Sequence, residues 1–182
     1  MTDLQIRRIR ATEIEFLEDM LFQTIFIQEG QPNLPKSIIK DPSLAKYIEN
    51  WGKDNLDIAL IAEINEKLIG AIWVRTFSES NKGYGFIDET IPEMAMAVYS
   101  EYRNKGIGKR FIQEMELMLQ ENNLKAVSLN VDKANYAFKF YQKEGFETVY
   151  QTETSATMIK YKKKMIITGI KNEKHFLEKN KL

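Results

Sequence analysis

The sequence predicts a mixed α/β (α+β) fold in which helices flank a mainly antiparallel central sheet. Two β-rich runs separated by a short polar turn read as a hairpin. A third apolar run leads directly into a glycine-containing loop and a long amphipathic helix. The complete order is β-α-α-β-β-β-α-β-α-β-β, in which antiparallel neighbours precede a single β-α-β-α unit, and this order favours a mixed sheet.

The first elements are a short strand and two helices. Residues 4–10 alternate enough to form a strand. Thr12 is expected to cap the following helix, and Glu15 would complete a capping box three residues later. Apolar residues at helical spacing continue this helix over 14–25. A stretch rich in glycine and proline ends it, and a second helix is expected over 41–51 with a proline near its first position.

The central and C-terminal elements supply most of the sheet. The hairpin strands are expected at 56–64 and 67–77, and the third apolar strand at 92–99. The helix that follows starts near Ile107 and carries an apolar face. The last helix should stop at Gly145, which is suited to the left-handed position after a helix end. The remaining elements are expected at 125–131 (strand), 135–144 (helix), and 146–151 with 156–164 (final hairpin).

Length and composition restrict the class of protein. The 182 residues are expected to form one domain over 1–165, followed by a polar tail over 166–182. The 26 Lys and Arg residues balance the 26 Asp and Glu residues, so no basic excess favours nucleic acid. The absence of cysteine excludes disulfides, thiolate metal sites and a cysteine nucleophile. With no signal-peptide pattern and no apolar run of about 20 residues, we expect a cytoplasmic protein without a membrane span or metal.

The glycine-containing loop before the long helix has the composition of a phosphate site. A Walker loop would need a hydroxyl residue after Lys109, where this chain has Arg110. A dinucleotide fingerprint would need a small residue in place of Phe111, although Asp132 has about the right spacing for a ribose contact. A nucleotide-binding module is therefore a remote alternative.

A third pattern, [RQ]-x-x-G-x-[GA], fits residues 103–108 without exception. Glycines allow a tight turn in which successive N–H groups converge on one anion at a helix N-terminus. Arg103, Lys105 and Lys109 would add positive charge around that anion. An ordinary strand-to-helix turn remains the structural alternative for the loop taken alone.

This loop and the segment 134–146 together resemble the GNAT superfamily of acetyl-CoA-dependent N-acetyltransferases. The resemblance is close over 92–146, and the flanking order of elements agrees over roughly 4–164. The two motifs lie about thirty residues apart, and their pairing is more specific than either motif alone.

The resemblance implies a coenzyme A site and several roles. The loop N–H groups would hold the pyrophosphate, and the strand before the loop would pair with the pantetheine arm. Asn135 would contact the cofactor, and the Tyr141 hydroxyl would lie near the thioester sulfur. The implied cofactor-binding residues are Ala97, Val98, Arg103, Asn104, Lys105, Gly106, Ile107, Gly108, Lys109, Asn135 and Tyr141.

The chemistry implied is direct transfer of an acetyl group to an amine, since no cysteine is present to form an acyl-enzyme. A backbone N–H near Val98 is the family-type donor for the oxyanion, and Tyr141 would protonate the departing thiolate. Glu93 is the first candidate for the general base, because burial would raise its pKa toward neutrality. Without the resemblance, Tyr141 would be interpreted as an aromatic residue of the core, and Glu93 as a solvent-exposed acid in a loop.

The function predicted is therefore N-acetylation of a primary amine, with a small-molecule acceptor favoured. The alternatives are a protein N-terminus or lysine as acceptor, and a catalytically silent regulator that binds acyl-CoA. Segments 26–35 and 72–77 are candidates to border the acceptor, although Trp73 also fits the core. The resemblance is compatible with a homodimer, but the sequence offers no patch for one.

Overall fold

The structure is a computed structural model that describes residues 3–54 and 56–162. Its strands and helices follow the predicted order, and the predicted tail, 166–182, lies outside the described residues. The strands are β1 (Gln5–Arg8), β2 (Ile58–Ile64), β3 (Lys67–Arg75), β4 (Glu93–Val98), β5 (Ala126–Asp132), β6 (Glu147–Gln151) and β7 (Ser155–Tyr161). The α-helices are α1 (Phe16–Thr24), α2 (Pro42–Ala45), α3 (Ile107–Glu121) and α4 (Tyr136–Lys143), and the 3-10 turns are η1 (Ala11–Glu13), η2 (Lys36–Lys40) and η3 (Ser100–Tyr102).

The seven strands form one sheet in the order β1-β2-β3-β4-β5-β7-β6. Every neighbouring pair is antiparallel except β4 and β5, which are parallel. The β2–β3 connection is a two-residue turn in which Asn65 and Glu66 both have positive φ, as the common hairpin turn requires. The predicted mixed, mainly antiparallel sheet flanked by helices is confirmed.

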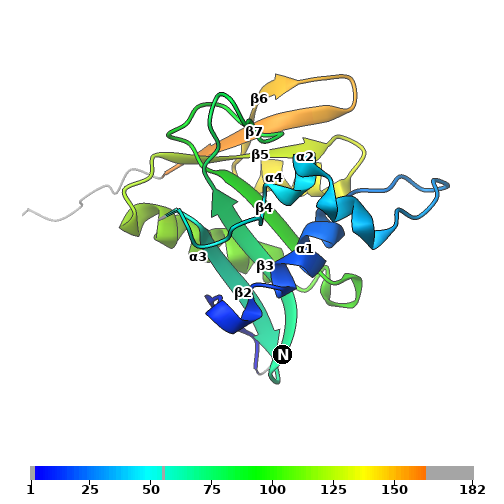
Figure 1. Cartoon of the computed structure of the whole chain (residues 1–182), viewed down its shortest axis with the longest axis vertical. Coiled ribbons are helices and arrows are strands. Elements are labelled where there is room, and N and C mark those ends of the chain that lie inside the picture. The colour runs from blue at the N-terminus through cyan, green and yellow to red at the C-terminus, as the bar shows by residue number, and fades with distance from the viewer. Residues whose placement is uncertain (1–2, 55, 163–182) are drawn as a thin grey trace, which may run out of the picture.

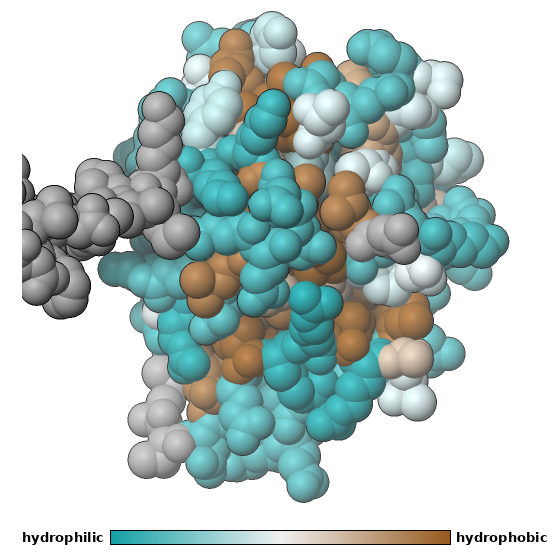
Figure 2. Space-filling view, turned by 90° about the vertical axis from the view of Figure 1, so that its left-hand side faces the viewer, coloured by the Kyte–Doolittle hydropathy of each residue, from teal (hydrophilic) through white to brown (hydrophobic). Residues whose placement is uncertain are grey.

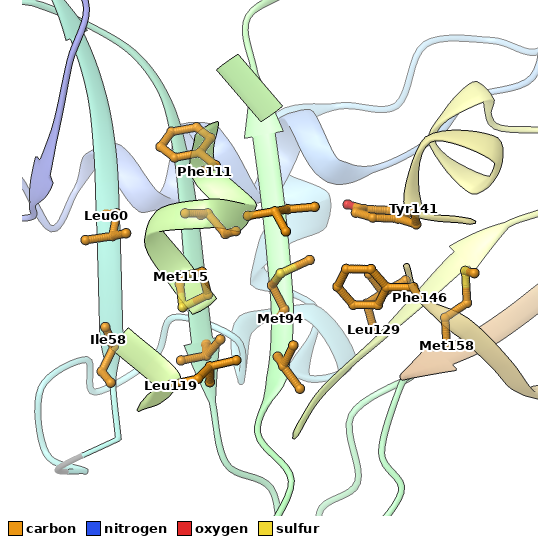
Figure 3. Close-up of a cluster of buried hydrophobic side chains, with 14 of the residues drawn as sticks. Ile58, Leu60, Met94, Phe111, Met115, Leu119, Leu129, Tyr141, Phe146 and Met158 are labelled. Carbon is orange, nitrogen blue, oxygen red and sulfur yellow. The ribbon is translucent and has the colours of Figure 1, made fainter. Parts of the chain in front are cut away.

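Side chains alternate between two cores on the two faces of the sheet. On one face, Met94 of β4 packs with Phe111 and Met115 of α3 and with residues of α4 (Figure 3). On the other face, Ala97 packs with the apolar side of α1 and with η2. Figure 1 shows α1 and α3 on opposite sides of the sheet, so β4 lies between two separately packed layers.

The predicted capping box of Thr12 and Glu15 is wrong. Glu13 instead accepts a hydrogen bond from the Arg10 backbone N–H at 2.8 Å and pairs with Arg7 at 2.7 Å. This ion pair to β1 stabilises the separate turn η1, and α1 begins only at Phe16.

The predicted helix over 41–51 is too long, because α2 ends at Ala45. Its start is as predicted, with Pro42 in the first turn and the Asp41 carboxylate accepting from the Ser43 N–H at 2.8 Å. Beyond the helix, the carbonyls of Lys46 and Glu49 accept hydrogen bonds from the Arg75 guanidinium at 2.9 and 2.7 Å. These bonds satisfy carbonyls that a longer helix would have used.

The predicted stop of the last helix at Gly145 is confirmed. Gly145 follows α4 with a φ of 86°, which is the left-handed conformation expected of a helix stop.

The side of the molecule shown in Figure 2 is mostly hydrophilic, with apolar side chains visible between polar ones. Among the described helices, none combines the length and the apolarity that crossing a bilayer would require.

Candidate active site

The parallel strands β4 and β5 diverge almost as soon as they meet. Their only register pair in the described residues is Glu93 with Ser128, and the Ser128 N–H donates to the Pro92 carbonyl at 3.0 Å. Beyond this point the two strands separate, and the rest of β4 has no strand on that side. The sheet is therefore opened in its middle.

The backbone of β4 presents hydrogen-bonding groups to this opening. The Tyr99 N–H donates to the Ile69 carbonyl at 3.0 Å, and the β3–β4 register continues from there. Because antiparallel pairing alternates, Ala97 directs its backbone groups to β3, whereas Met96 and Val98 direct theirs into the opening. The side chain of Ala97 belongs to the α1 face.

A cavity of about 1050 Å³ occupies this opening and extends to both sides of β4. We call its two parts the α3/α4 side and the α1/α2 side. The α3/α4 side is lined by Tyr102, Arg103, Asn104, Gly106, Ile107, Gly108, Lys109, Leu129, Val131, Asn135, Tyr136, Ala137, Phe140, Tyr141 and Glu144. Asn130 and Asp132 of β5 also line the cavity, and strand alternation points their side chains to the same face of the sheet as Glu93. The α1/α2 side is lined by Leu21, Gln23, Thr24, Ile25, Phe26, Ile27, Leu34, Ile38, Leu44, Tyr47 and Tyr84. Residues 93–98 of β4 lie between the two parts.

The glycine loop on the α3/α4 side forms the start of α3. Asn104 and Gly106 both have positive φ, so the chain turns sharply before the helix. The N–H groups of residues 107–109 have no helical carbonyl to bond, which leaves them available to an anion. A Cβ built on Gly108 would lie 3.2 Å from the Phe140 ring, so a larger residue there would be crowded.

The three predicted cations of the loop have different environments. Lys109 is exposed and lines the cavity. Arg103 also lines it, but its Nε donates to the Val98 carbonyl at 2.8 Å and thereby ties the loop to the end of β4. Lys105 is not part of the lining, since its Nζ donates to the Glu101 carbonyl at 2.8 Å and lies near the Tyr102 ring.

Helix α4 brings the other two predicted cofactor contacts to the same side. The Asn135 side chain caps the helix by accepting from the Ala137 N–H at 2.9 Å, which leaves its amide NH₂ as a donor. Tyr141 packs against Phe140 and Phe146, and its hydroxyl points toward β4 (Figure 3). No described residue bonds that hydroxyl. Burial raises the pKa of Tyr141, so at neutral pH it is a proton donor.

Among the residues that the structure describes, Glu93 is the one buried carboxyl group at the cavity, with an exposed fraction of 4%. Its Oε1 accepts from the Tyr47 hydroxyl at 2.7 Å and from the Gly85 N–H at 2.8 Å. Its Oε2 is buried without a hydrogen bond in the described structure and lies beside Gly83, where a Cβ would be only 2.0 Å away. Burial raises the pKa of Glu93 to about 7, against the opposing effect of the two hydrogen bonds.

The family profile described as "Acetyltransferase (GNAT) domain" matches residues 55–148, which is more than half of the chain. This chain is a GNAT acetyltransferase. It is therefore an acyltransferase that depends on acetyl-CoA. A search among curated proteins finds no significant match.

Solved structures share the GNAT fold along most of the chain. PaiA N-acetyltransferase from Thermoplasma acidophilum, in complex with coenzyme A, aligns with a TM-score of 0.64 at 21% identity, covering 88% of this chain and 99% of that one. An N-acetyltransferase from Staphylococcus aureus Mu50 gives 0.65 at 15% identity, covering 89% and 100%. The ribosomal-protein-S18-alanine N-acetyltransferase from Escherichia coli gives 0.59 at 12% identity, covering 91% and 98%.

The residues of this GNAT site suit coenzyme A. The free N–H groups at the start of α3 match the pyrophosphate, and the Met96 backbone groups with the Val98 N–H match the amides of the pantetheine arm. The Val98 carbonyl is already bonded by Arg103. Gly108 leaves the approach beside Phe140 open. Within residues 3–54 and 56–162, no three His, Cys, Asp or Glu side chains gather in a way that would hold a metal ion.

The two segments expected to border the acceptor lie in different environments. Segment 26–35 does reach the cavity through Phe26 and Leu34, whereas Trp73 is a buried core residue. Sequence reasoning missed Tyr47 and Tyr84, which surround the Glu93 carboxyl. No local pattern marks them, because α2 and the 78–90 loop reach Glu93 only through the tertiary fold.

Proposed function

We propose that this acetyltransferase transfers the acetyl group of acetyl-CoA directly to the primary amine of a small molecule. Glu93 receives the amine proton, and Tyr141 gives a proton to the departing thiolate. The observation that carries the proposal is a single cavity that has Glu93 toward its α1/α2 side and Tyr141 on its α3/α4 side. A base and an acid on opposite sides of one strand are what a transfer between two bound partners needs.

The transfer releases one proton for each amine that is acetylated. An alkylammonium ion, with a pKa of about 10, loses one proton to Glu93, directly or through a water molecule, before its nitrogen attacks the acetyl carbon. The C–N bond forms, the C–S bond breaks, and the nitrogen loses its second proton to solvent. Tyr141 donates to the sulfur and regains a proton from water. The Val98 N–H, directed into the opening, stabilises the negative charge that develops on the carbonyl oxygen.

The burial of Glu93 supports its role as the base. A carboxyl group with a pKa of about 7 is half ionised at neutral pH and is a stronger base than an ordinary glutamate. Asp88 and Glu89 do not line the cavity, and Asp88 is occupied by the N–H and hydroxyl of Thr90. Asp132 and Glu144 do line the cavity, but both are partly exposed, so the buried Glu93 is the carboxylate best suited to the task.

The main alternative acceptor is a protein N-terminus. It is supported by the structural similarity to the S18-alanine N-acetyltransferase of E. coli, at 12% identity. The absence of cysteine and the use of acetyl-CoA support a cytoplasmic location.

The first experiment is thermal unfolding of the whole chain with acetyl-CoA, dephospho-CoA, ATP or NAD. A ligand at 100 times its Kd adds about 2.7 kcal/mol to the free energy of unfolding, which is easily seen in Tm. Gly108→Trp should abolish the effect of acetyl-CoA by filling the approach beside Phe140. Lys109→Glu should weaken it without touching the core, and Lys53→Glu, exposed and outside the cavity, is the matched control.

Stabilisation of the wild type by acetyl-CoA, lost in Gly108→Trp and unchanged in Lys53→Glu, is the expected result. Equal stabilisation by ATP or NAD would instead favour a nucleotide-binding module. If acetyl-CoA bound but no amine were ever acetylated, the chain would be a silent acyl-CoA sensor.

A further inference from the structure

The two sides of the cavity differ in charge. On the α3/α4 side the lining includes Arg103, Lys109 and Glu144. The α1/α2 side contains no charged side chain among the described residues that line it, and the carboxylates of the sheet on that face are Glu93 and Asp132. The Asp132 Oδ1 already accepts from the Ala134 N–H at 2.7 Å. Most of its wall is aliphatic, formed by Leu21, Ile25, Ile27, Leu34, Ile38 and Leu44.

The few polar groups of the α1/α2 side are largely occupied. The Thr24 hydroxyl donates to the Leu21 carbonyl at 2.6 Å, and the Tyr84 hydroxyl donates to the Ser43 hydroxyl at 3.1 Å. The Tyr47 hydroxyl donates to Glu93 and accepts from the Tyr84 N–H at 2.7 Å. Of these polar side chains, only Gln23 makes no hydrogen bond to a described residue.

The mouth of this side is apolar as well. Phe26, Leu34 and Tyr84 all line the cavity and are 36%, 37% and 59% exposed. Large apolar side chains gathered at an opening are typical of a surface that binds an apolar ligand. Tyr84 also stacks on Tyr47 with ring centroids 6.4 Å apart, so an aromatic wall leads toward the Glu93 carboxyl.

The nearest cations would repel a second positive charge on an acceptor. Lys46 is close enough to Glu93 to oppose the rise in its pKa, and it is held by the Lys82 carbonyl and the Phe77 ring. Asp19, which lies in α1 itself, is paired with Lys36 and is not part of the lining. A second ammonium group placed along the aliphatic wall would therefore lose water without finding a carboxylate in that wall.

We propose that the acceptor is a primary monoamine with an aliphatic or aromatic body. Its single ammonium group lies at Glu93, and its apolar body lies along the α1/α2 wall toward Phe26 and Leu34. Polyamines, aminoglycosides and basic peptides are disfavoured, because each places a second charge or several polar groups against that wall. This inference rests on the proposed N-acetyltransferase function and specifies its substrate class.

The test compares kcat/KM for matched amines with saturating acetyl-CoA. Hexylamine and hexane-1,6-diamine have the same length and differ by one terminal amino group. We expect kcat/KM for hexylamine and 2-phenylethylamine to exceed that for the diamine and spermidine by about 100-fold or more. The reason is that burying an unpaired charge costs several times more free energy than losing the contacts of one methylene group. From propylamine to hexylamine, each added methylene should raise kcat/KM about fourfold, as expected for its transfer to an apolar wall.

A variant with a new carboxylate in the α1/α2 wall tests whether the wall causes the preference for monoamines. A difference in the inherent reactivity of the amines would not change in this variant. Leu34→Asp should reduce the ratio of hexylamine to hexane-1,6-diamine at least about tenfold, because the second ammonium gains a partner. Leu117→Asp is the matched control, since Leu117 is also an exposed large apolar residue and lies outside the cavity. It should leave the ratio unchanged.

Each outcome decides between stated alternatives. A preference for the diamine or spermidine, or a ratio that Leu34→Asp does not change, would overturn the monoamine inference and leave the acetyltransferase function intact. A peptide with an N-terminal alanine as the best substrate would overturn it in favour of protein acetylation. If no amine were acetylated while acetyl-CoA still raised Tm, the proposed function would fail, and the inference with it.

Discussion

The two sides of β4 meet their ligands with different atoms. On the α3/α4 side the chain offers backbone N–H groups, two glycines and cations from one contiguous loop, residues 103–109. On the α1/α2 side it offers an aliphatic and aromatic wall with one buried carboxyl group, Glu93, assembled from segments far apart in the sequence. The first arrangement suits a ligand that is always the same, and the second is free to vary with the acceptor.

The difference is clearest in how each side treats charge. The start of α3 leaves N–H groups available to a phosphate and surrounds them with cations, so a negative ligand is stabilised. Glu93 instead has no cation bonded to it, and burial keeps its carboxyl group partly protonated. In the proposed function, the α1/α2 side therefore receives one ammonium group at Glu93 and takes up its proton.

Glu93→Gln is expected to have the largest effect on this comparison. The amide oxygen can still accept from Tyr47 and Gly85, so the local structure is kept while the base is lost. We expect kcat/KM to fall about 10²- to 10⁴-fold at pH 7.5, with the acetyl-CoA shift in Tm unchanged. In the wild type, kcat/KM should fall as the pH drops through about 7, because protonated Glu93 cannot accept a proton. Unchanged turnover in the variant would mean that Glu93 only clamps the 83–86 loop.

The same substitution should change stability in a pH-dependent way. The folded pKa of Glu93, about 7, lies above its ordinary value of 4.5, so the native state binds the proton more tightly. The corresponding stabilisation is complete below pH 4.5 and is lost as the pH rises through 7. Since a tenfold change in proton affinity corresponds to about 1.4 kcal/mol, Glu93→Gln should gain roughly 2–3 kcal/mol relative to wild type between pH 5 and pH 8. Urea unfolding at both pH values measures this.

Glu13 provides a control of opposite sign. Hydrogen bonds from Arg7 lower its pKa to about 2, so its contribution is present above its ordinary pKa of 4.5 and is lost as the pH falls toward 2. Glu13→Gln should therefore destabilise the chain at neutral pH and have less effect in acid. If both variants changed with pH in the same direction, the charge difference between the two sites would be refuted.

Tyr141→Phe tests the acid on the α3/α4 side. Phenylalanine keeps the ring contacts with Phe140 and Phe146 and removes only the hydroxyl. We expect kcat to fall about 10²-fold while the affinity for acetyl-CoA is retained. Tyr136→Phe is the control, because Tyr136 lines the same side but is exposed, and its rate should change less than about threefold. A Tyr141→Phe variant with full turnover would remove Tyr141 from the mechanism.

All the residues predicted for the α3/α4 side except Lys105 line the cavity, and the physical reason is locality. The loop over 103–109 and the helix after Asn135 carry their chemistry within a few consecutive residues, so spacing alone reveals it. Glu93 was also found, because it starts an apolar strand. Which strands separate was not predictable, since the divergence of β4 and β5 depends on the packing of α3 and α4 against the sheet.

The α1/α2 side was largely missed for the same reason. Tyr47 is 46 residues from Glu93 in the sequence, and only the sheet order and the short α2 bring their side chains together. The wrong capping box has a more local origin, because Glu13 and not Glu15 accepts from the Arg10 N–H, and Arg7, six residues away, holds the Glu13 carboxylate. Local rules fail where a side chain's partner is distant in sequence.

Tyr47→Phe gives the smallest and most specific effect that we expect. The Tyr47 hydroxyl lowers the pKa of Glu93 by donating to Oε1, so its removal should raise that pKa further and move the acidic limb of kcat/KM to higher pH, by up to roughly one pH unit. Activity near pH 6.5 should fall several-fold and recover toward the wild-type value above pH 8. Tyr84→Phe is the matched control, since it loses the bond to Ser43 but keeps the backbone N–H that Tyr47 accepts. A uniform loss at every pH in Tyr47→Phe would show that the tyrosine only supports the wall, whereas a displaced limb would show that it sets the basicity of Glu93.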